Sequence, residues 1–201
     1  MSVVLEAALD VVAGWASLPA GLVERAHPSI VRVHGRGPAG ASGVVWRPNA
    51  VLTNHHVVAG ADRALRVLAV DGRVRPARLL AASERLDLAL LEVADDLVPA
   101  PLGDSTRLRV GQLVFAIGHP WGQPWVVTAG IVSGLGPVHL PGGAGEVACI
   151  RSDVRLAPGS SGGPLLDARG KVVGLNAMVI GGDLAVAIPS AVARSWLEST
   201  P

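Results

Sequence analysis

Short apolar segments recur along the chain from residue 29 onward, separated by glycine, proline, asparagine and aspartate. This punctuation is typical of β-strands joined by turns. The first half contains six such segments, at 29–34, 42–47, 50–53, 65–70, 74–81 and 86–93. The second half contains six more, at 110–117, 126–133, 147–152, 164–167, 172–178 and 184–188. The pattern predicts an all-β fold of two six-stranded antiparallel barrels, spanning 28–104 and 105–201.

Both ends of the chain depart from the strand pattern. The segment 1–27 has apolar residues at helical spacing, namely Leu5, Leu9, Val12 and Trp15 or Ala16. We expect an N-terminal amphipathic helix there, packed on the body or on another subunit. Residues 190–200 follow Pro189 and carry an apolar stripe of Val192, Trp196 and Leu197, which predicts a closing helix.

Composition narrows the classes of function. Half of the residues are apolar, only 3% are aromatic, and the formal net charge is +1 with no block of like charges. A nucleic-acid or anionic-membrane surface needs a basic footprint, so neither partner is expected. The long uncharged run at 110–145 is broken by prolines and glycines and does not predict a membrane span. The single cysteine, Cys149, has no partner for an internal disulfide and is expected to be a small buried residue.

Histidine and cysteine spacing gives no metal signature, since neither C-x-x-C nor H-x-x-x-H occurs. We therefore expect neither a metal nor another cofactor. The first twenty residues contain Glu6 and Asp10 and no basic residue, which argues against a secretory signal. As written, the chain is expected in the cytoplasm, and only a start further upstream would place it in the periplasm or outside the cell.

The strongest chemical candidate is Ser161, which lies in the string Gly159-Ser160-Ser161-Gly162-Gly163-Pro164. Glycines there allow a tight exposed turn that lets a substrate carbonyl approach backbone amides. Taken alone, such a string is more often a surface turn. It also fits the G-x-S-x-G elbow of α/β-hydrolases, but that fold places its histidine after the serine. All six histidines precede Ser161, which leaves the order His, Asp, Ser.

Two upstream segments supply partners in that order. Residues 50–59 run from an apolar strand to a polar tip that holds His55 and His56. Asp87 interrupts an apolar run at 86–93, which predicts a carboxylate inside a buried strand. A buried carboxylate needs a hydrogen-bond partner, and a histidine N–H would satisfy it.

Four motifs resemble the HtrA/DegP family of trypsin-like serine proteases. They are Thr53-Asn54-x-His56-Val57-Val58, Asp87-Leu88-Ala89-Leu90, the stretch at 128–136, and Pro158-Gly159-x-Ser161-Gly162-Gly163-Pro164. The motifs occur in family order, and the resemblance covers about residues 28–198. It implies a trypsin-like double barrel with His56, Asp87 and Ser161 as a catalytic triad. His55 fills a variable position, and the remaining four histidines are expected to be packed or solvated.

The resemblance also implies the reaction. The chain is expected to be a serine endopeptidase that forms an acyl-enzyme, with the amides of Gly159 and Ser161 as the oxyanion hole. Protein or peptide substrates follow, with unfolded or misfolded proteins as the expected class in protein quality control. The alternative is a catalytically resting scaffold that binds peptides or unfolded chains. A homo-oligomer is a further implication, since apolar N-terminal residues mediate trimer contacts in the family. Typical members carry PDZ domains after the protease, and none is expected within the 201 residues of this sequence.

Two residues depart from the family pattern. Ser160 replaces the asparagine that most family members have before the nucleophile. It also differs from the aspartate that pairs with a cleaved N-terminus in activatable digestive proteases, so activation by cleavage is not expected. Arg155 occupies a position near the base of the primary specificity pocket, where a small residue is usual. If Arg155 points into the pocket it favours acidic residues before the scissile bond. We prefer an outward Arg155, because an unpaired buried guanidinium is costly. The pocket walls are then small, which favours valine or alanine, and the residues expected to form them are Asn176, Ala177, Met178 and Val186.

Overall fold

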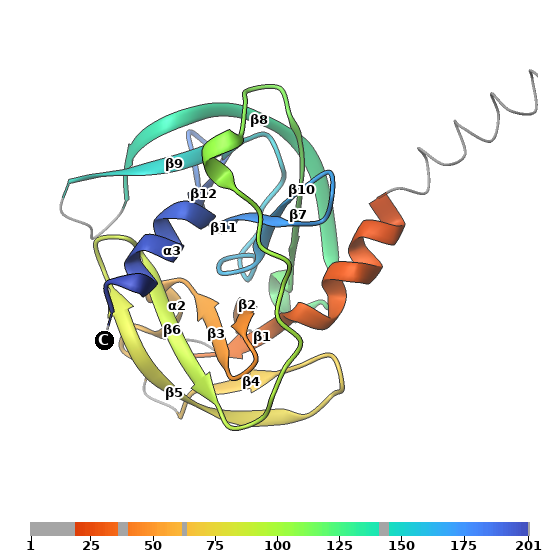
Figure 1. The fold of residues 1–201 in the computed structure, drawn as a ribbon, viewed down its shortest axis with the longest axis vertical. Helices are drawn as coiled ribbons and strands as arrows, with labels where there is room; N and C mark the ends of the chain where they lie inside the picture. Colours follow the sequence, from red (N-terminus) through yellow and green to blue (C-terminus); the bar gives the residue numbers. More distant parts are fainter. Residues whose placement is uncertain (1–18, 36–39, 62–63, 141–144, 201) are drawn as a thin grey trace, which may run out of the picture.

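The computed structural model describes residues 19–35, 40–61, 64–140 and 145–200, and its strands form two six-stranded antiparallel barrels (Figure 1). The first barrel, in the lower half of Figure 1, has the strand order β1-β2-β3-β6-β5-β4 and closes where β4 pairs with β1. Its strands are β1 (Ile30–His34), β2 (Ala41–Arg47), β3 (Ala50–Thr53), β4 (Arg66–Leu68), β5 (Val74–Ser83) and β6 (Leu88–Val93).

The second barrel lies above the first in Figure 1 and has the strand order β10-β11-β12-β9-β8-β7. It closes where β7 pairs with β10. Its strands are β7 (Leu113–Gly118), β8 (Val126–His139), β9 (Glu146–Ser152), β10 (Pro164–Asp167), β11 (Val172–Ile180) and β12 (Leu184–Pro189). The double barrel expected from the sequence is therefore confirmed.

Apolar residues fill three clusters. The interior of the first barrel is built mainly from valines, among them Val31, Val45, Val51 and Val67. The interior of the second barrel contains Val114, Val132, Ile150 and Leu165. A third and larger cluster includes residues of both barrels, such as Leu52, Leu88, Phe115, Ile117 and Leu166. Burial of the apolar side chains in this third cluster holds the two barrels together.

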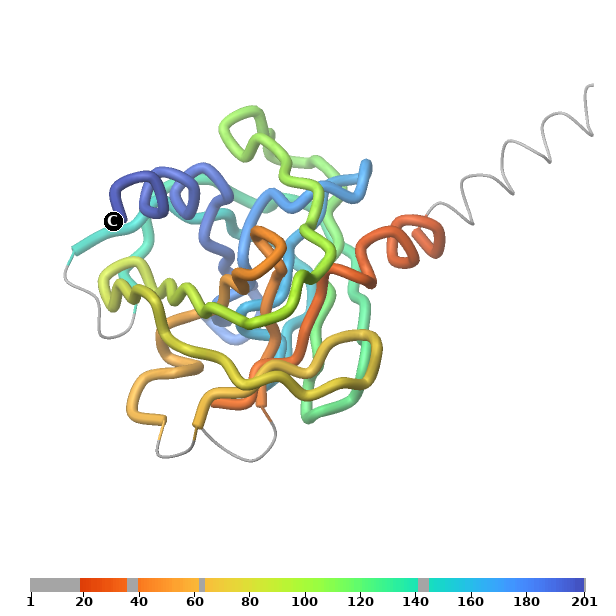
Figure 2. Tube along the Cα trace, turned by 60° about the horizontal axis from the view of Figure 1, so that its bottom comes forward, coloured from red at the N-terminus to blue at the C-terminus, as the bar shows by residue number. Residues whose placement is uncertain are grey.

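The segment between β6 and β7 crosses from one barrel to the other, and its path is visible in both orientations (Figures 1 and 2). It contains the short helix η2 (Ser105–Arg107) and a bridge from Leu102 to Val172. The other short helices are η1 (His27–Ser29), α2 (His55–Val58) and η3 (Pro120–Gly122). The closing helix α3 (Ser190–Glu198) is present, and its Ala193 and Leu197 are buried in the third cluster.

The N-terminal helix predicted from Leu5, Leu9 and Val12 lies outside the described residues. Residues 19–26 are helical, and Leu22 and Ala26 are buried in the third cluster. No helix in the described part of the chain combines the length and the apolar character that a bilayer crossing requires.

Two strand predictions were wrong. Asp87 was expected inside the strand at 86–93, but β6 begins at Leu88, and Asp87 occupies a turn with φ of 51°. The strand expected at 126–133 instead continues to His139 and pairs with β9 as far as Glu146. Gly134 and Gly136 obscured the second part of this strand, because sequence patterns treat glycine as a break.

Candidate active site

Ser161 lies in the loop that joins β9 to β10, and tight packing requires the glycines on either side of it. Gly159 has φ of +103°, and a Cβ at this position would lie 2.6 Å from the carbonyl oxygen of His119. Gly162 has φ of +80°, and its Cβ would collide with the carbonyl oxygen of Ser42 on β2. Side chains at either position would separate this loop from the surfaces against which it packs.

Consecutive carbonyl oxygens fix the orientation of the loop backbone. They accept hydrogen bonds as follows: Pro158 from the Trp121 amide (2.8 Å), Gly159 from the Ser42 hydroxyl (2.8 Å) and Ser160 from the Gly163 amide (3.1 Å). The N–H and C=O of a trans peptide point in opposite directions. The amides of Gly159 and Ser161 therefore point away from Trp121 and Gly163, and neither donates a hydrogen bond to any residue that the structure describes.

His56 and Asp87 form a directly bonded pair at the edge of the first barrel. His56 is in α2, immediately after β3, and its Nδ1 lies 2.8 Å from Oδ2 and 3.0 Å from Oδ1 of Asp87. The backbone N–H of His56 also donates to Asp87 Oδ1, at 3.0 Å. With Nδ1–H donated to the carboxylate, Nε2 is the ring nitrogen left to accept a proton. The His56 side chain is 48% exposed and that of Asp87 is 14% exposed, so the base faces solvent and its orienting group is covered.

Asn54 supports this pair, and the sequence analysis gave it no separate role. It is fully buried, and its Nδ2 donates to the carbonyl oxygen of Asp87 at 2.9 Å. This bond stabilises the left-handed backbone of Asp87, a conformation that is uncommon outside glycine. Its place two residues before His56 is the only sequence signal that could have identified it.

Ser161 lies where the two barrels meet, but its hydroxyl does not bond to His56. The adjacent Gly162 packs against Ser42 and Thr53 of the first barrel, and Thr53 is three residues before His56. Ser161 Oγ donates to the carbonyl oxygen of Ala177 on β11, at 3.0 Å. The structure thus joins His56 to Asp87 directly and brings Ser161 to the same interface between barrels, with its hydroxyl turned toward β11.

The residues expected around a specificity pocket differ in their exposure to solvent. Arg155 is exposed, in the orientation that we preferred from the sequence, and within the described residues it forms no ion pair. Asn176, Ala177 and Val186 are buried on β11 and β12, and Met178 is half-buried. The Ser161 hydroxyl contacts this second group directly through Ala177.

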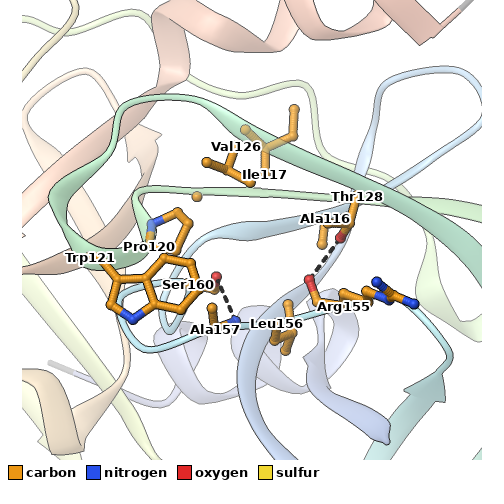
Figure 3. A pocket seen from close by; sticks show the side chains of 11 residues that line it. Ala116, Ile117, Pro120, Trp121, Val126, Thr128, Arg155, Leu156, Ala157 and Ser160 are labelled. Carbon is orange, nitrogen blue, oxygen red and sulfur yellow. Dashed lines mark hydrogen bonds between the residues drawn. The ribbon is translucent and has the colours of Figure 1, made fainter.

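A cavity of about 270 Å³ lies against the loop that joins β9 to β10, and Arg155 is one of its lining residues. Leu156, Ala157 and Ser160 form its loop side, while Trp121, Pro120, Val126 and Thr128 contribute other parts of the wall (Figure 3). The Arg155 backbone oxygen accepts a bond from Thr128 Oγ1 at 2.9 Å, whereas its side chain points away from the other residues drawn (Figure 3). The lining contains neither Ser161 nor His56.

His119 is buried beneath the same loop, and Trp125 packs against it edge-on. Burial is the main cause that lowers the pKa of His119 to about 4, with nearby Arg32 as the next contribution. It is therefore neutral near pH 7 and has a packing role, as expected. Cys149 is also buried, and burial raises the pKa of its thiol to about 11.

Comparison with known protein families and sequences matches this chain to serine proteases. The family described as "Trypsin-like peptidase domain" matches residues 41–175. The chain is 45% identical over 169 residues to the "Probable periplasmic serine endoprotease DegP-like" of Marinomonas sp. (strain MWYL1), covering 81% of this chain and 35% of that protein. It is 42% identical over 164 residues to the "Serine protease Do-like HtrA" of Bacillus subtilis (strain 168), covering 74% of this chain and 36% of that protein.

Solved structures agree with the sequence relatives. The structure titled "HtrA-type protease AlgW with decapeptide" superposes with a TM-score of 0.82 at 29% identity, covering 90% of this chain and 66% of that one. The structure titled "HtrA-type protease AlgW with tripeptide" gives a TM-score of 0.81 at 34% identity, covering 90% of this chain and 62% of that one. The chain spans about a third of the length of the curated relatives above.

Proposed function

The chain belongs to the trypsin-like peptidase family, among the HtrA and DegP serine endoproteases, and on this premise we propose that it hydrolyses peptide bonds through an acyl-enzyme. The observation that carries the proposal is the bonded pair of His56 and Asp87 on one barrel, set beside the glycine loop of Ser161 on the other.

The proposed roles follow from the donors and acceptors. Ser161 Oγ turns from Ala177 toward His56 Nε2 and attacks the substrate carbonyl while His56 takes its proton. Asp87 holds the ring through Nδ1 and stabilises the imidazolium that forms. His56 then protonates the leaving amine. Water next attacks the acyl carbon while His56 takes a proton from it, and His56 returns that proton to Ser161 Oγ as the acid product leaves.

The oxyanion hole is assigned to the amides of Gly159 and Ser161. Both lack a hydrogen-bond partner among the described residues, and the carbonyls of their own peptide units are held in place. Such fixed donors stabilise the charge that develops on the substrate oxygen, and a single one is worth roughly 3 kcal/mol in similar sites.

Unfolded or misfolded proteins are the proposed substrates, which fits a role in protein quality control. The half-exposed His56 gives an extended chain access to the triad. The exposed Arg155 and the small buried wall of Asn176, Ala177 and Val186, with Met178 beside it, favour valine or alanine before the scissile bond.

Labelling with a fluorophosphonate probe tests the proposal. The wild-type chain should be labelled and should cleave fluorescein-labelled casein, whereas Ser161→Ala and His56→Ala should do neither. Thermal melts of all three proteins serve as the folding control. A folded wild type that is neither labelled nor proteolytic would contradict the proposed activity.

The Ser161–Ala177 hydrogen bond is the one observation that favours the alternative, a resting scaffold that binds peptides or unfolded chains. In that case wild type and Ser161→Ala would bind unfolded casein equally and neither would cleave it. Labelling of wild type alone separates the two functions.

Location and assembly are further proposals. The cytoplasm is proposed from the acidic residues Glu6 and Asp10 near the start of the printed sequence, whereas the Marinomonas relative is described as periplasmic. Fractionation of the native host, with an antibody to this chain, decides between them. A homo-oligomer, a trimer as in the family, is proposed from the family resemblance and is tested by light scattering of the purified chain.

A further inference from the structure

Ser42 connects the two barrels through its backbone amide and its hydroxyl. It lies on β2 and is fully buried. Its N–H donates to the carbonyl oxygen of Ser161 at 2.9 Å, and its own carbonyl accepts from Thr53 Oγ1 at 2.7 Å. Its hydroxyl accepts from the amide of His119 at 2.9 Å and donates to the carbonyl oxygen of Gly159 at 2.8 Å.

The bond to Gly159 is unlike the neighbouring bonds in the loop. The carbonyls of Pro158, Ser160 and Ser161 are all held by backbone amides, which no substitution of a side chain removes directly. The Gly159 carbonyl alone depends on a side chain, and it belongs to the peptide unit between the two proposed oxyanion donors. With φ of +103° and no Cβ, Gly159 has little intrinsic preference to keep that unit in one orientation.

The space around Ser42 accepts only a small side chain. The position that a Cβ on Gly118 would take is 3.0 Å from Ser42 Oγ, and the corresponding position on Gly163 is 3.2 Å from Ser42 Cβ. Alanine would fit but would leave both the Gly159 carbonyl and the His119 amide without the hydroxyl. Buried polar groups that lose a partner destabilise the conformation that buries them.

We propose that Ser42 is a positioning residue for catalysis, whose hydroxyl holds the Gly159 peptide so that the amides of Gly159 and Ser161 converge on one oxyanion. The inference rests on the proposed peptidase function. Ser42 touches neither the substrate nor the reacting atoms, and it acts through the loop backbone. It belongs to the first barrel, so the hydroxyl couples the geometry of the hole to the docking of the two barrels.

The test compares Ser42→Ala with Ser190→Ala. Ser190 is the matched control, because it is also buried and its hydroxyl also donates to a backbone carbonyl, that of Gly103, at 3.0 Å. On fluorescein-labelled casein, Ser42→Ala should lower kcat by about tenfold or more while KM stays within about twofold, since only the transition state uses the hole. Ser190→Ala should leave both constants near wild type.

Amide hydrogen exchange measured by mass spectrometry gives a readout that does not need activity. Ser42→Ala should speed exchange in peptides that cover 156–163, and Ser190→Ala should not. Unchanged kcat together with unchanged exchange in Ser42→Ala would overturn the inference. If wild type proves inactive, the proposed function fails and the exchange result alone decides the role of Ser42. If Ser42→Ala does not fold, Ser42→Cys takes its place in both experiments, because cysteine has a similar shape and is a weaker hydrogen-bond donor. A lower kcat and faster exchange are again expected, and no change in either would overturn the inference.

Discussion

Replacing Gly159 with alanine tests the geometry of the proposed oxyanion hole. The new Cβ would lie 2.6 Å from the carbonyl oxygen of His119, where ordinary contact begins at 3.4 Å, so the backbone has to move by roughly 0.8 Å. His119 O also accepts from the Gly122 amide at 3.1 Å, so it cannot yield freely. Oxyanion donors act within about 2.7–3.1 Å of the developing charge, and a displacement of this size removes the Gly159 amide from that range.

The expected loss in kcat is on the order of 10²- to 10³-fold, or about 3–4 kcal/mol, with a small change in KM. Gly111→Ala is the matched control, because Gly111 has φ of +90° with no atom within 4 Å of its Cβ position. Both variants carry the strain of a left-handed alanine, about 1–2 kcal/mol, but only one displaces the loop. Casein hydrolysis and thermal melts are measured in parallel. A Gly159→Ala enzyme with kcat within about threefold of wild type would refute the reasoning, as would an equal kcat loss in Gly111→Ala.

Three further predictions concern the surrounding residues. Asp87→Asn should lower kcat on casein on the order of 10⁴-fold, because an amide cannot favour the His56 tautomer whose Nε2 accepts a proton; retained kcat would remove Asp87 from the mechanism. Arg155→Ala should leave the preferred residue before the scissile bond unchanged in a peptide library, because the side chain is exposed, and a switch away from acidic residues would contradict the aliphatic preference. His119 has a folded-state pKa of about 4 against an ordinary value of 6.5, so the unfolded state binds more protons between these values. Urea unfolding should therefore show a free energy that is lower at pH 5 than at pH 7, by up to about 2 kcal/mol, and His119→Gln should show a smaller difference.

The sequence predicted a strand wherever a short apolar run is bounded by turn residues. All twelve strands occur near their expected positions, and the closing helix begins at Ser190 as expected. The patterns failed at Asp87, because a hydropathy run does not reveal that a residue has a positive φ or that Asn54 supports its carbonyl. They also shortened β8, in which Gly134 and Gly136 lie opposite β9 instead of ending the strand.

The candidate site was predictable only as a set of residues. Motif order named His56, Asp87 and Ser161, and the structure places the first two in direct contact. The direction of the Ser161 hydroxyl depends on Ala177, which no local pattern contains. The role proposed for Ser42 depends on partners 77 and 117 positions away in sequence, and such contacts are properties of the folded chain alone.

Each strand in the described part of the chain pairs with two neighbours, so neither sheet presents an open side. Unpaired strand edges are templates on which other chains add and aggregate. Unfolded polypeptides, the substrates proposed for this protein, expose extended segments that are prone to aggregate. Because both barrels are closed, such segments would find no unpaired strand edge on which to add in either sheet that the structure describes.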